Sequence, residues 1–323
     1  MKLGKLTNEQ LKEFIIDRLQ TNRSEVIIGS GIGIDSAVLQ LGGDYCTIST
    51  DPITAASKNA GKLAVHVSAN DIAASGAEPF AVLVTLLVPP HSSLEEIGIL
   101  MQDIFEEANA LAIDVVGGHT EVTDAVNKPI ISITALGRTD KVLSYENIQA
   151  GDALLLTKEL GIEGALILGE DYKDRIVGVL SAEEEAALVG LKEQLSVVPE
   201  AKIAKEQGAI AMHDITEGGI YGAAYEMAEA AGLGLFLEKN KLRLNPLAKK
   251  LTKHLGIDPY RLISSGSMLI ACQADDAKGM LNALYAANIT ATQIGVFQAG
   301  NEVIADDEKI APPTQDALFS LSS

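Results

Sequence analysis

Residues 46–79 are CTISTDPITAASKNAGKLAVHVSANDIAASGAEP, a stretch that places two isolated carboxylates beside apolar elements. A β-prone run leads to Asp51-Pro52, and because proline cannot donate to a strand ladder, we expect Asp51 at the end of a strand. Residues 61–75 carry apolar side chains at helical spacing, which predicts a helix that packs on a sheet. Asp71 lies in this helix among small residues, so we expect it to be half-buried and to need a hydrogen-bond partner or a cation. The alternative is that Asp71 caps a turn.

The bulk composition favours two layered domains. The chain has 323 residues, of which 47% are apolar and only 4% aromatic, so its core is built mainly from Ala, Val, Ile and Leu. We place the domain boundary so that residues 1–147 form the first domain and residues 148–323 the second. The net charge of −19 argues against nonspecific binding of nucleic acid or an anionic membrane surface.

Cysteine usage and hydropathy predict a cytoplasmic location. Cys46 and Cys272 lie far apart, each in an apolar run, and the first ten residues, MKLGKLTNEQ, show no features of a signal peptide. No apolar stretch approaches the roughly 20 residues that a bilayer span requires. We therefore expect reduced thiols in a soluble cytoplasmic protein.

A glycine-rich turn, GSGIGIDSA at residues 29–37, carries Asp35 between two β-prone runs. Such a turn can wrap phosphates, but the phosphate-loop and dinucleotide patterns both fail here, because no Gly-Lys-Ser/Thr follows and no clear helix opens. The alternative is a plain β-hairpin.

Two further polar turns are candidate sites. The strand predicted at residues 113–116 ends in GGHTE, where Gly117 and Gly118 leave backbone N–H groups for an anion and His119 and Glu121 add a possible metal ligand and a carboxylate. The alternative there is a tight turn with a surface histidine. The second turn, HDITEGG at residues 213–219, connects a strand to a helix whose first N–H groups are free to bind an anion.

The motifs together resemble a known superfamily. Their order along the chain is STD at 49–51, GKLAV at 61–65, ND at 70–71, SGAEP at 75–79, GGHT at 117–120 and HDITEGG at 213–219. In this order and spacing, which cover about residues 29–297, they resemble the aminoimidazole ribonucleotide synthetase-like superfamily, and within it the branch of hydrogenase maturation factors. The resemblance implies two α/β domains (an α+β arrangement), an N-terminal sheet that forms a barrel in a homodimer, and ATP bound with magnesium (Mg) at the domain junction.

The resemblance also assigns roles to single residues. Magnesium ligands are implied at Asp35, Asp51 and Asp71. Catalytic roles are implied at Asp214 and His119, and contacts with the nucleotide are implied at Asn70, Gly117, Gly118, Thr120 and Glu121. Two positions depart from the pattern, since His119 and Ile34 stand where relatives often carry an acid.

Three functions remain open at this point. The first is an ATP-dependent enzyme that phosphorylates an oxygen of a small or protein-tethered acceptor and so activates it. The second is a dimeric ATP-binding module with little turnover, and the third is a kinase of a thiamine-like metabolite. In the hydrogenase maturation branch a C-terminal cysteine accepts a carbamoyl group, and residues 311–323 hold no cysteine, so we expect that carbamoyl chemistry to be absent.

Overall fold

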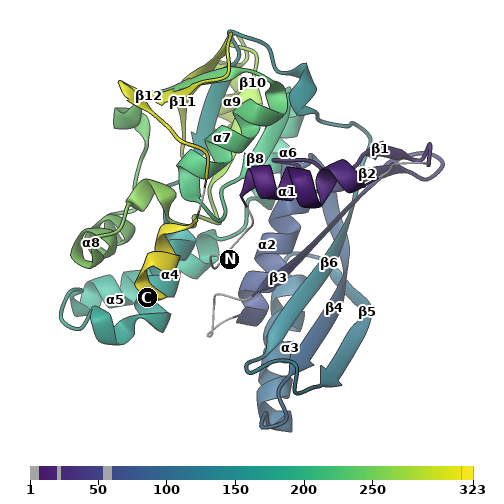
Figure 1. Cartoon of the computed structure of the whole chain (residues 1–323), viewed down its shortest axis with the longest axis vertical. Coiled ribbons are helices and arrows are strands. Elements are labelled where there is room, and N and C mark those ends of the chain that lie inside the picture. The colour runs from purple at the N-terminus through teal and green to yellow at the C-terminus, as the bar shows by residue number, and fades with distance from the viewer. Residues whose placement is uncertain (1–6, 20–22, 54–59, 314, 323) are drawn as a thin grey trace.

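The computed structural model describes residues 7–19, 23–53, 60–313 and 315–322, which are divided between two β-sheets (Figure 1). Residues 54–59 of the stretch quoted first, and Thr314 and Ser323 of the terminal segment, lie outside the described residues. The helices are α1 (Asn8–Phe14), α2 (Ala60–Ala74), α3 (Leu94–Ala110), α4 (Ile162–Asp171), α5 (Ala182–Gly190), α6 (Val198–Glu206), α7 (Gly219–Ala231), α8 (Pro246–Leu255) and α9 (Ala277–Ala286).

The first sheet has the strand order β1-β2-β3-β6-β4-β5. Its neighbours are antiparallel except β4 and β5, which are parallel and joined by α3, as a crossover connection requires. Its strands are β1 (Val26–Ile28), β2 (Ala37–Gln40), β3 (Tyr45–Ile53), β4 (Glu78–Val88), β5 (Asp114–Val122) and β6 (Ile130–Thr139).

The second sheet has the order β13-β12-β9-β11-β7-β10-β8. Its central strands β7 and β10 are buried along their whole length because α7 covers one face of the sheet, and α6 and α9 cover the other. Its strands are β7 (Ala153–Thr157), β8 (Ala211–Asp214), β9 (Gly234–Leu237), β10 (Met268–Cys272), β11 (Ala291–Gln298), β12 (Val303–Ala305) and β13 (Glu308–Lys309). The predicted α/β fold with two sheets is confirmed, while the domain boundary and the dimer barrel stay predictions.

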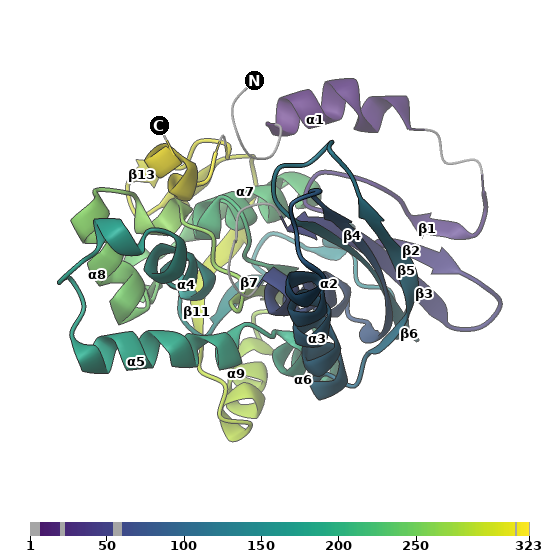
Figure 2. The ribbon, with the colours of Figure 1, turned by 90° about the horizontal axis from the view of Figure 1, so that it is seen from below.

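The helix α2 connects the two halves of the molecule. It packs against β3 and β6 on one side and against α6 and β8 on the other, and Figure 2 shows it between the first sheet and the helices of the second domain. Its composition of small and apolar residues suits this position, since 13 of its 15 residues are buried. Asp71 is accordingly more deeply buried than the sequence suggested, with 5% of its surface exposed.

Two strand boundaries differ from the expectation. The strand β3 continues through Asp51-Pro52 to Ile53. Among the described residues β2 pairs with β3 only up to Ile48, so one edge of β3 has no partner strand at Pro52. A proline is tolerated at such an edge because it has no N–H group to donate. The predicted GGHTE turn is instead the second half of β5. This strand pairs with β4 from Asp114 to Val122, with one register shift just before Gly117. A side chain at Gly118 would place its Cβ 1.9 Å from the carbonyl oxygen of Val84, so this glycine serves the close approach of the two strands.

No helix among the described residues is long and apolar enough to span a membrane.

Candidate functional site

A cavity of about 660 Å³ lies between the two halves of the molecule. Its walls come from the Gly29–Ala37 loop, β3, α2, the start of α4, the turn after β8 and the terminal segment 316–319. The glycine-rich segment is therefore both a hairpin, since β1 and β2 pair, and part of a cavity wall. None of the described residues that line the cavity is Lys or Arg, whereas its lining includes the carboxylates of Asp35, Asp51, Asp71, Glu163, Glu217, Glu226 and Asp316.

Asp71 is the most deeply placed of these acids on the side of the first sheet. The hydroxyl of Ser49 on β3 donates a hydrogen bond to its Oδ2 at 2.6 Å and so fixes the carboxyl group. Burial, followed by the charges of Asp214, Asp51 and Asp35, raises the pKa of Asp71 well above its usual value. We refer to Asp35, Asp51, Asp71 and Asp214 as the aspartate cluster.

His213 bridges two carboxylates from opposite walls. Its Nδ1 lies 3.0 Å from Oδ1 of Asp35, and its Nε2 lies 3.3 Å from Oε2 of Glu226 on α7. Burial alone would lower the pKa of His213, but Asp35 and Glu226 raise it to about 10, so the imidazole is protonated at neutral pH. Tyr145 adds to this arrangement, since its hydroxyl donates to the carbonyl of Met212 at 2.8 Å and lies 3.4 Å from Asp35 Oδ2.

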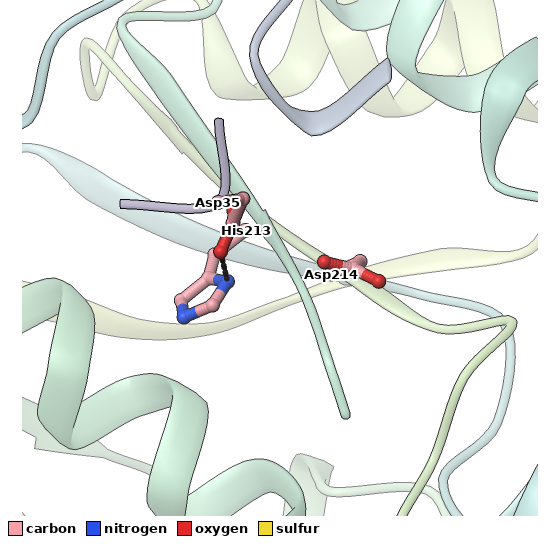
Figure 3. Close-up of side chains that lie close together, drawn as sticks. All are labelled: Asp35, His213 and Asp214. Atoms are coloured by element: carbon pink, nitrogen blue, oxygen red, sulfur yellow. Dashed lines mark ion pairs between the residues drawn. The ribbon is translucent and has the colours of Figure 1, made fainter. Parts of the chain in front are cut away.

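Consecutive residues of one strand give the site its two sides. Side chains alternate between the faces of a strand, so His213 turns toward α7 while Asp214 turns toward Asp71 on α2. Figure 3 shows the ring of His213 directed at Asp35, with Asp214 extending away on the same strand. Ligand atoms of Asp35, His213 and Asp214 all lie within 4.8 Å of one another.

This arrangement fits a hard divalent cation. Magnesium takes oxygen ligands from a few carboxylates together with substrate phosphates, and the aspartate cluster offers such oxygens beside an open cavity. Without a cation in the site, the protonated His213 is a counter-charge to Asp35. Magnesium prefers oxygen ligands, which the aspartates supply.

The other nucleotide contacts inferred from the resemblance are not in this cavity. Asn70 is fully buried, and its amide group donates to the carbonyl of Leu195 at 2.9 Å and accepts from the N–H of Val197 at 2.8 Å, so it holds α2 against the second domain. The residues Gly117, Gly118, His119, Thr120 and Glu121 are exposed on β5, at the far edge of the first sheet. His119 and Glu121 lie 3.5 Å apart as an exposed pair.

Sequence reasoning missed several residues of the cavity. Glu226 was not predicted because it lies in the middle of α7, one acid among the ordinary polar residues of a helix. Glu163 follows a glycine turn and Asp316 follows the residues PPTQ at 312–315, and neither acid lies in one of the motifs named above. The motif STD did contain Ser49, whose position two residues before Asp51 puts both side chains on the same face of β3.

Two family models match the chain. Residues 33–139 match the AIR synthase related protein, N-terminal domain, and residues 149–308 match the AIR synthase related protein, C-terminal domain. The chain is 30% identical to the carbamoyl dehydratase HypE of Escherichia coli strain K12, in an alignment that covers 78% of this chain and 75% of that protein. It is 27% identical to a putative hydrogenase expression/formation protein of Methanocaldococcus jannaschii, over 87% of this chain and 84% of that protein.

Solved structures have the same fold. ThiL complexed with AMPPCP and TMP superposes with a TM-score of 0.78 at 20% identity, covering 98% of each chain. The hydrogenase maturation protein HypE in complex with ATP superposes with a TM-score of 0.73 at 18% identity, covering 98% of this chain and 97% of that chain.

Proposed function

Because the chain belongs to the AIR synthase related family, we propose that it is a magnesium-dependent enzyme that uses ATP to phosphorylate an oxygen of an acceptor molecule. The observation that carries this proposal is the aspartate cluster. Three of its members, Asp35, Asp51 and Asp71, line a cavity whose described lining has no basic side chain other than His213. A triphosphate would be repelled from such a cavity unless cations accompany it. Relatives that were solved with ATP or AMPPCP support the choice of nucleotide.

In this proposal the residues of the site have different roles. Asp35, Asp51 and Asp71 hold magnesium, which supplies positive charge to neutralise the phosphates when it is bound. Ser49 orients the carboxyl group of Asp71 by its hydrogen bond. His213 keeps a proton between Asp35 and Glu226, and Asp214 faces the cluster from the second domain.

ATP turnover by the purified protein tests the function. We expect release of ADP or AMP that stops when EDTA removes divalent cations and resumes when magnesium is restored. Asp174→Asn is the matched control, because Asp174 is an exposed acid outside the cavity, and it should turn over ATP like the wild type. Turnover that persists in EDTA would contradict the proposed role of the metal.

Two alternatives are kept for specific reasons. Ile34 packs against the core of the second domain, so the position where relatives often carry an acid is apolar here, which favours an ATP-binding module with little turnover. The shared fold with ThiL favours a metabolite kinase. Phosphorylation of thiamine monophosphate by the purified protein would distinguish the latter from the main proposal.

The acceptor belongs to a separate molecule in this proposal. Cys272 is buried, and burial, followed by Asp276 and Asp152, raises the pKa of its thiol to about 12. Burial also raises the pKa of Cys46, and neither thiol lines the cavity. Since the thiolate is the nucleophile, neither cysteine is suited to carry a carbamoyl group.

We further propose that the protein is a homodimer in which β5 completes the site of the partner. On β4, Leu83 and Thr85 alternate with buried residues and lie on the face of the first sheet that no described helix covers. The strand register puts His119 opposite Thr85 and Glu121 opposite Leu87, so both residues share this face. A second copy that packs on this face would cover its apolar side chains and would bring His119 and Glu121 to another chain.

Sedimentation of the wild type and of Leu83→Asp tests the dimer. We expect the wild type to sediment as a dimer at micromolar concentration and Leu83→Asp to be largely monomeric, because a charge would be buried in the apolar interface. Val177→Asp is the control, since Val177 is an exposed apolar residue of the second domain, 81% accessible. A monomeric wild type would remove both the interface and the role of β5. Weaker ATP binding by the Leu83→Asp monomer would support a shared site.

A further inference from the structure

The cavity has a second group of acids, separate from the aspartate cluster. Glu163 at the start of α4, Glu217 in the turn after β8 and Asp316 in the terminal segment all line it. The charges of Asp316 and Glu217 act on Glu163, and Glu217 also acts on Asp316, whereas the acids that act on Asp71 are those of the aspartate cluster. We call Glu163, Glu217 and Asp316 the second acid cluster.

Backbone hydrogen bonds fix two of these carboxylates in place. The carboxylate of Asp316 accepts from the N–H groups of Gly218 and Leu318, both at 2.8 Å, and Glu163 Oε2 accepts from the N–H of Ser265 at 3.2 Å. A carboxylate has roughly four acceptor positions, so these bonds leave each group able to accept more. Both residues are 3% exposed, and their burial, together with their neighbouring acids, raises the pKa of each to about 7.

Apolar side chains border this cluster. Leu318 and Phe319 of the terminal segment, Leu63 and Val67 of α2, and Ile263 line the same cavity. Leu318 also packs in the apolar cluster that includes Leu63 and Val67, so the terminal segment contacts both domains. This end of the cavity therefore combines an apolar wall with fixed hydrogen-bond acceptors.

We propose that the second acid cluster receives the acceptor substrate and selects one with an apolar body and a polar end that carries N–H donors, either a neutral amide or a protonated amine. This inference rests on the proposed phosphoryl transfer, because it assigns the two ends of one cavity to the nucleotide and to the acceptor. Above about pH 7, where Glu163 and Asp316 are ionised, an acceptor that ends in a carboxylate or phosphate would be repelled by three acids, with no basic side chain beside them in the described lining of the cavity. An N–H donor would instead satisfy the buried carboxylates, which otherwise face the cavity at a desolvation cost.

Benzamidine, benzamide and benzoate are probes of nearly equal shape that test this selection. They share a phenyl ring and a planar end that is cationic, neutral with N–H donors, or anionic. We would titrate each into the wild-type protein with magnesium and AMPPCP present and follow binding by ligand-observed NMR. We expect benzamidine and benzamide to bind at least about tenfold more tightly than benzoate. Equal binding of benzoate, or no binding of any probe, would overturn the proposal.

Variants of the second acid cluster test whether it causes the preference among the probes. Glu163→Gln and Asp316→Asn keep an amide oxygen for the backbone N–H groups but remove the charge, and we expect each to weaken benzamidine binding by about tenfold. Glu217→Gln changes a partly exposed residue, so it replaces the other two variants in this test if they do not fold. Unchanged benzamidine affinity in the folded variants would show that another part of the protein binds the probe and would overturn the assignment.

Asp51→Asn separates this inference from the proposed function. The variant alters the aspartate cluster and leaves the second acid cluster intact, so the order of the three probes should persist while ATP binding weakens. If Asp51→Asn lost both ATP binding and the preference among the three probes, the assignment of separate ends of the cavity to nucleotide and acceptor would be contradicted. If the wild type bound no ATP but still bound benzamidine and benzamide more tightly than benzoate, only the proposed phosphoryl transfer would be contradicted.

Discussion

Asp71→Asn is expected to weaken magnesium-dependent ATP binding by at least about tenfold and at the same time to stabilise the protein without ligand. Binding weakens because an oxygen anion that would hold the cation is lost. Stability increases because burial and three neighbouring aspartates disfavour the charge of Asp71, as the direction of its pKa shift indicates. The expected gain in the free energy of unfolding is on the order of 1–3 kcal/mol near neutral pH.

The amide preserves the local geometry of this position. Asn has almost the shape of Asp, and its Oδ1 still accepts the hydrogen bond that Ser49 donates. Calorimetry with ATP and magnesium measures the first effect, and urea unfolding in EDTA measures the second. Asp51→Asn should weaken binding as well, and Asp174→Asn should change neither quantity. A sharp loss of stability in Asp71→Asn would indicate a structural carboxylate and would remove Asp71 from the proposed metal site.

The opposite signs of the two effects exclude a trivial explanation. A variant that binds ATP poorly because it is misfolded should also unfold more easily. A more stable protein with weaker binding points to a carboxylate that is kept for its charge at a cost in stability, as expected of a ligand site.

Local sequence rules could predict much of the fold, but they failed at GGHTE. Two adjacent glycines favour a turn, and no neighbouring residue shows that β4 lies alongside. In the folded chain the parallel pairing with β4 overrides that preference, and Gly118 is needed for the approach of the strands. Pairing between distant segments is information that a window of a few residues does not contain.

The aspartate cluster could be proposed from the order of short motifs, whereas its surroundings could not. Each aspartate lies in or next to a strand or helix that the spacing of apolar residues predicts. Glu226 and Asp316 have no such setting, and only the packing of α7 and of the terminal segment brings them to the cavity. The opposite error occurred at Asn70, which was predicted as a site residue because it stands beside Asp71 in a motif. Its hydrogen bonds instead hold the two domains together.

The free energy of unfolding without ligand is expected to fall as the pH increases from about 6.5 toward about 9, because the protonated form of His213 is bound by two carboxylates. The pKa of His213 is about 10 in the folded protein and about 6.5 when the chain unfolds. The folded state therefore holds the proton more tightly. The resulting stabilisation is complete below about pH 6.5 and is lost as the pH passes about 10.

The size and the origin of this slope can both be measured. A shift of one pKa unit corresponds to about 1.4 kcal/mol, so the loss between about pH 6.5 and about pH 9 is on the order of 3 kcal/mol. Above that range Cys272, whose pKa is raised to about 12, begins to contribute in the same direction. The comparison is best made in the Asp71→Asn background, which removes the raised carboxyl pKa of Asp71 from the same pH range.

In that background, adding Asp35→Asn should flatten the slope, since Asp35 is the largest cause that raises the pKa of His213. It should also lower stability at neutral pH, by roughly 3–5 kcal/mol, because a buried imidazolium loses a charged partner. Urea unfolding at several pH values in EDTA measures both effects. If the slope were the same with and without Asp35, the proton on His213 would not depend on this pair. The stabilisation that His213 gains from Asp35 and Glu226 would then need another explanation than a protonated imidazole held between two carboxylates.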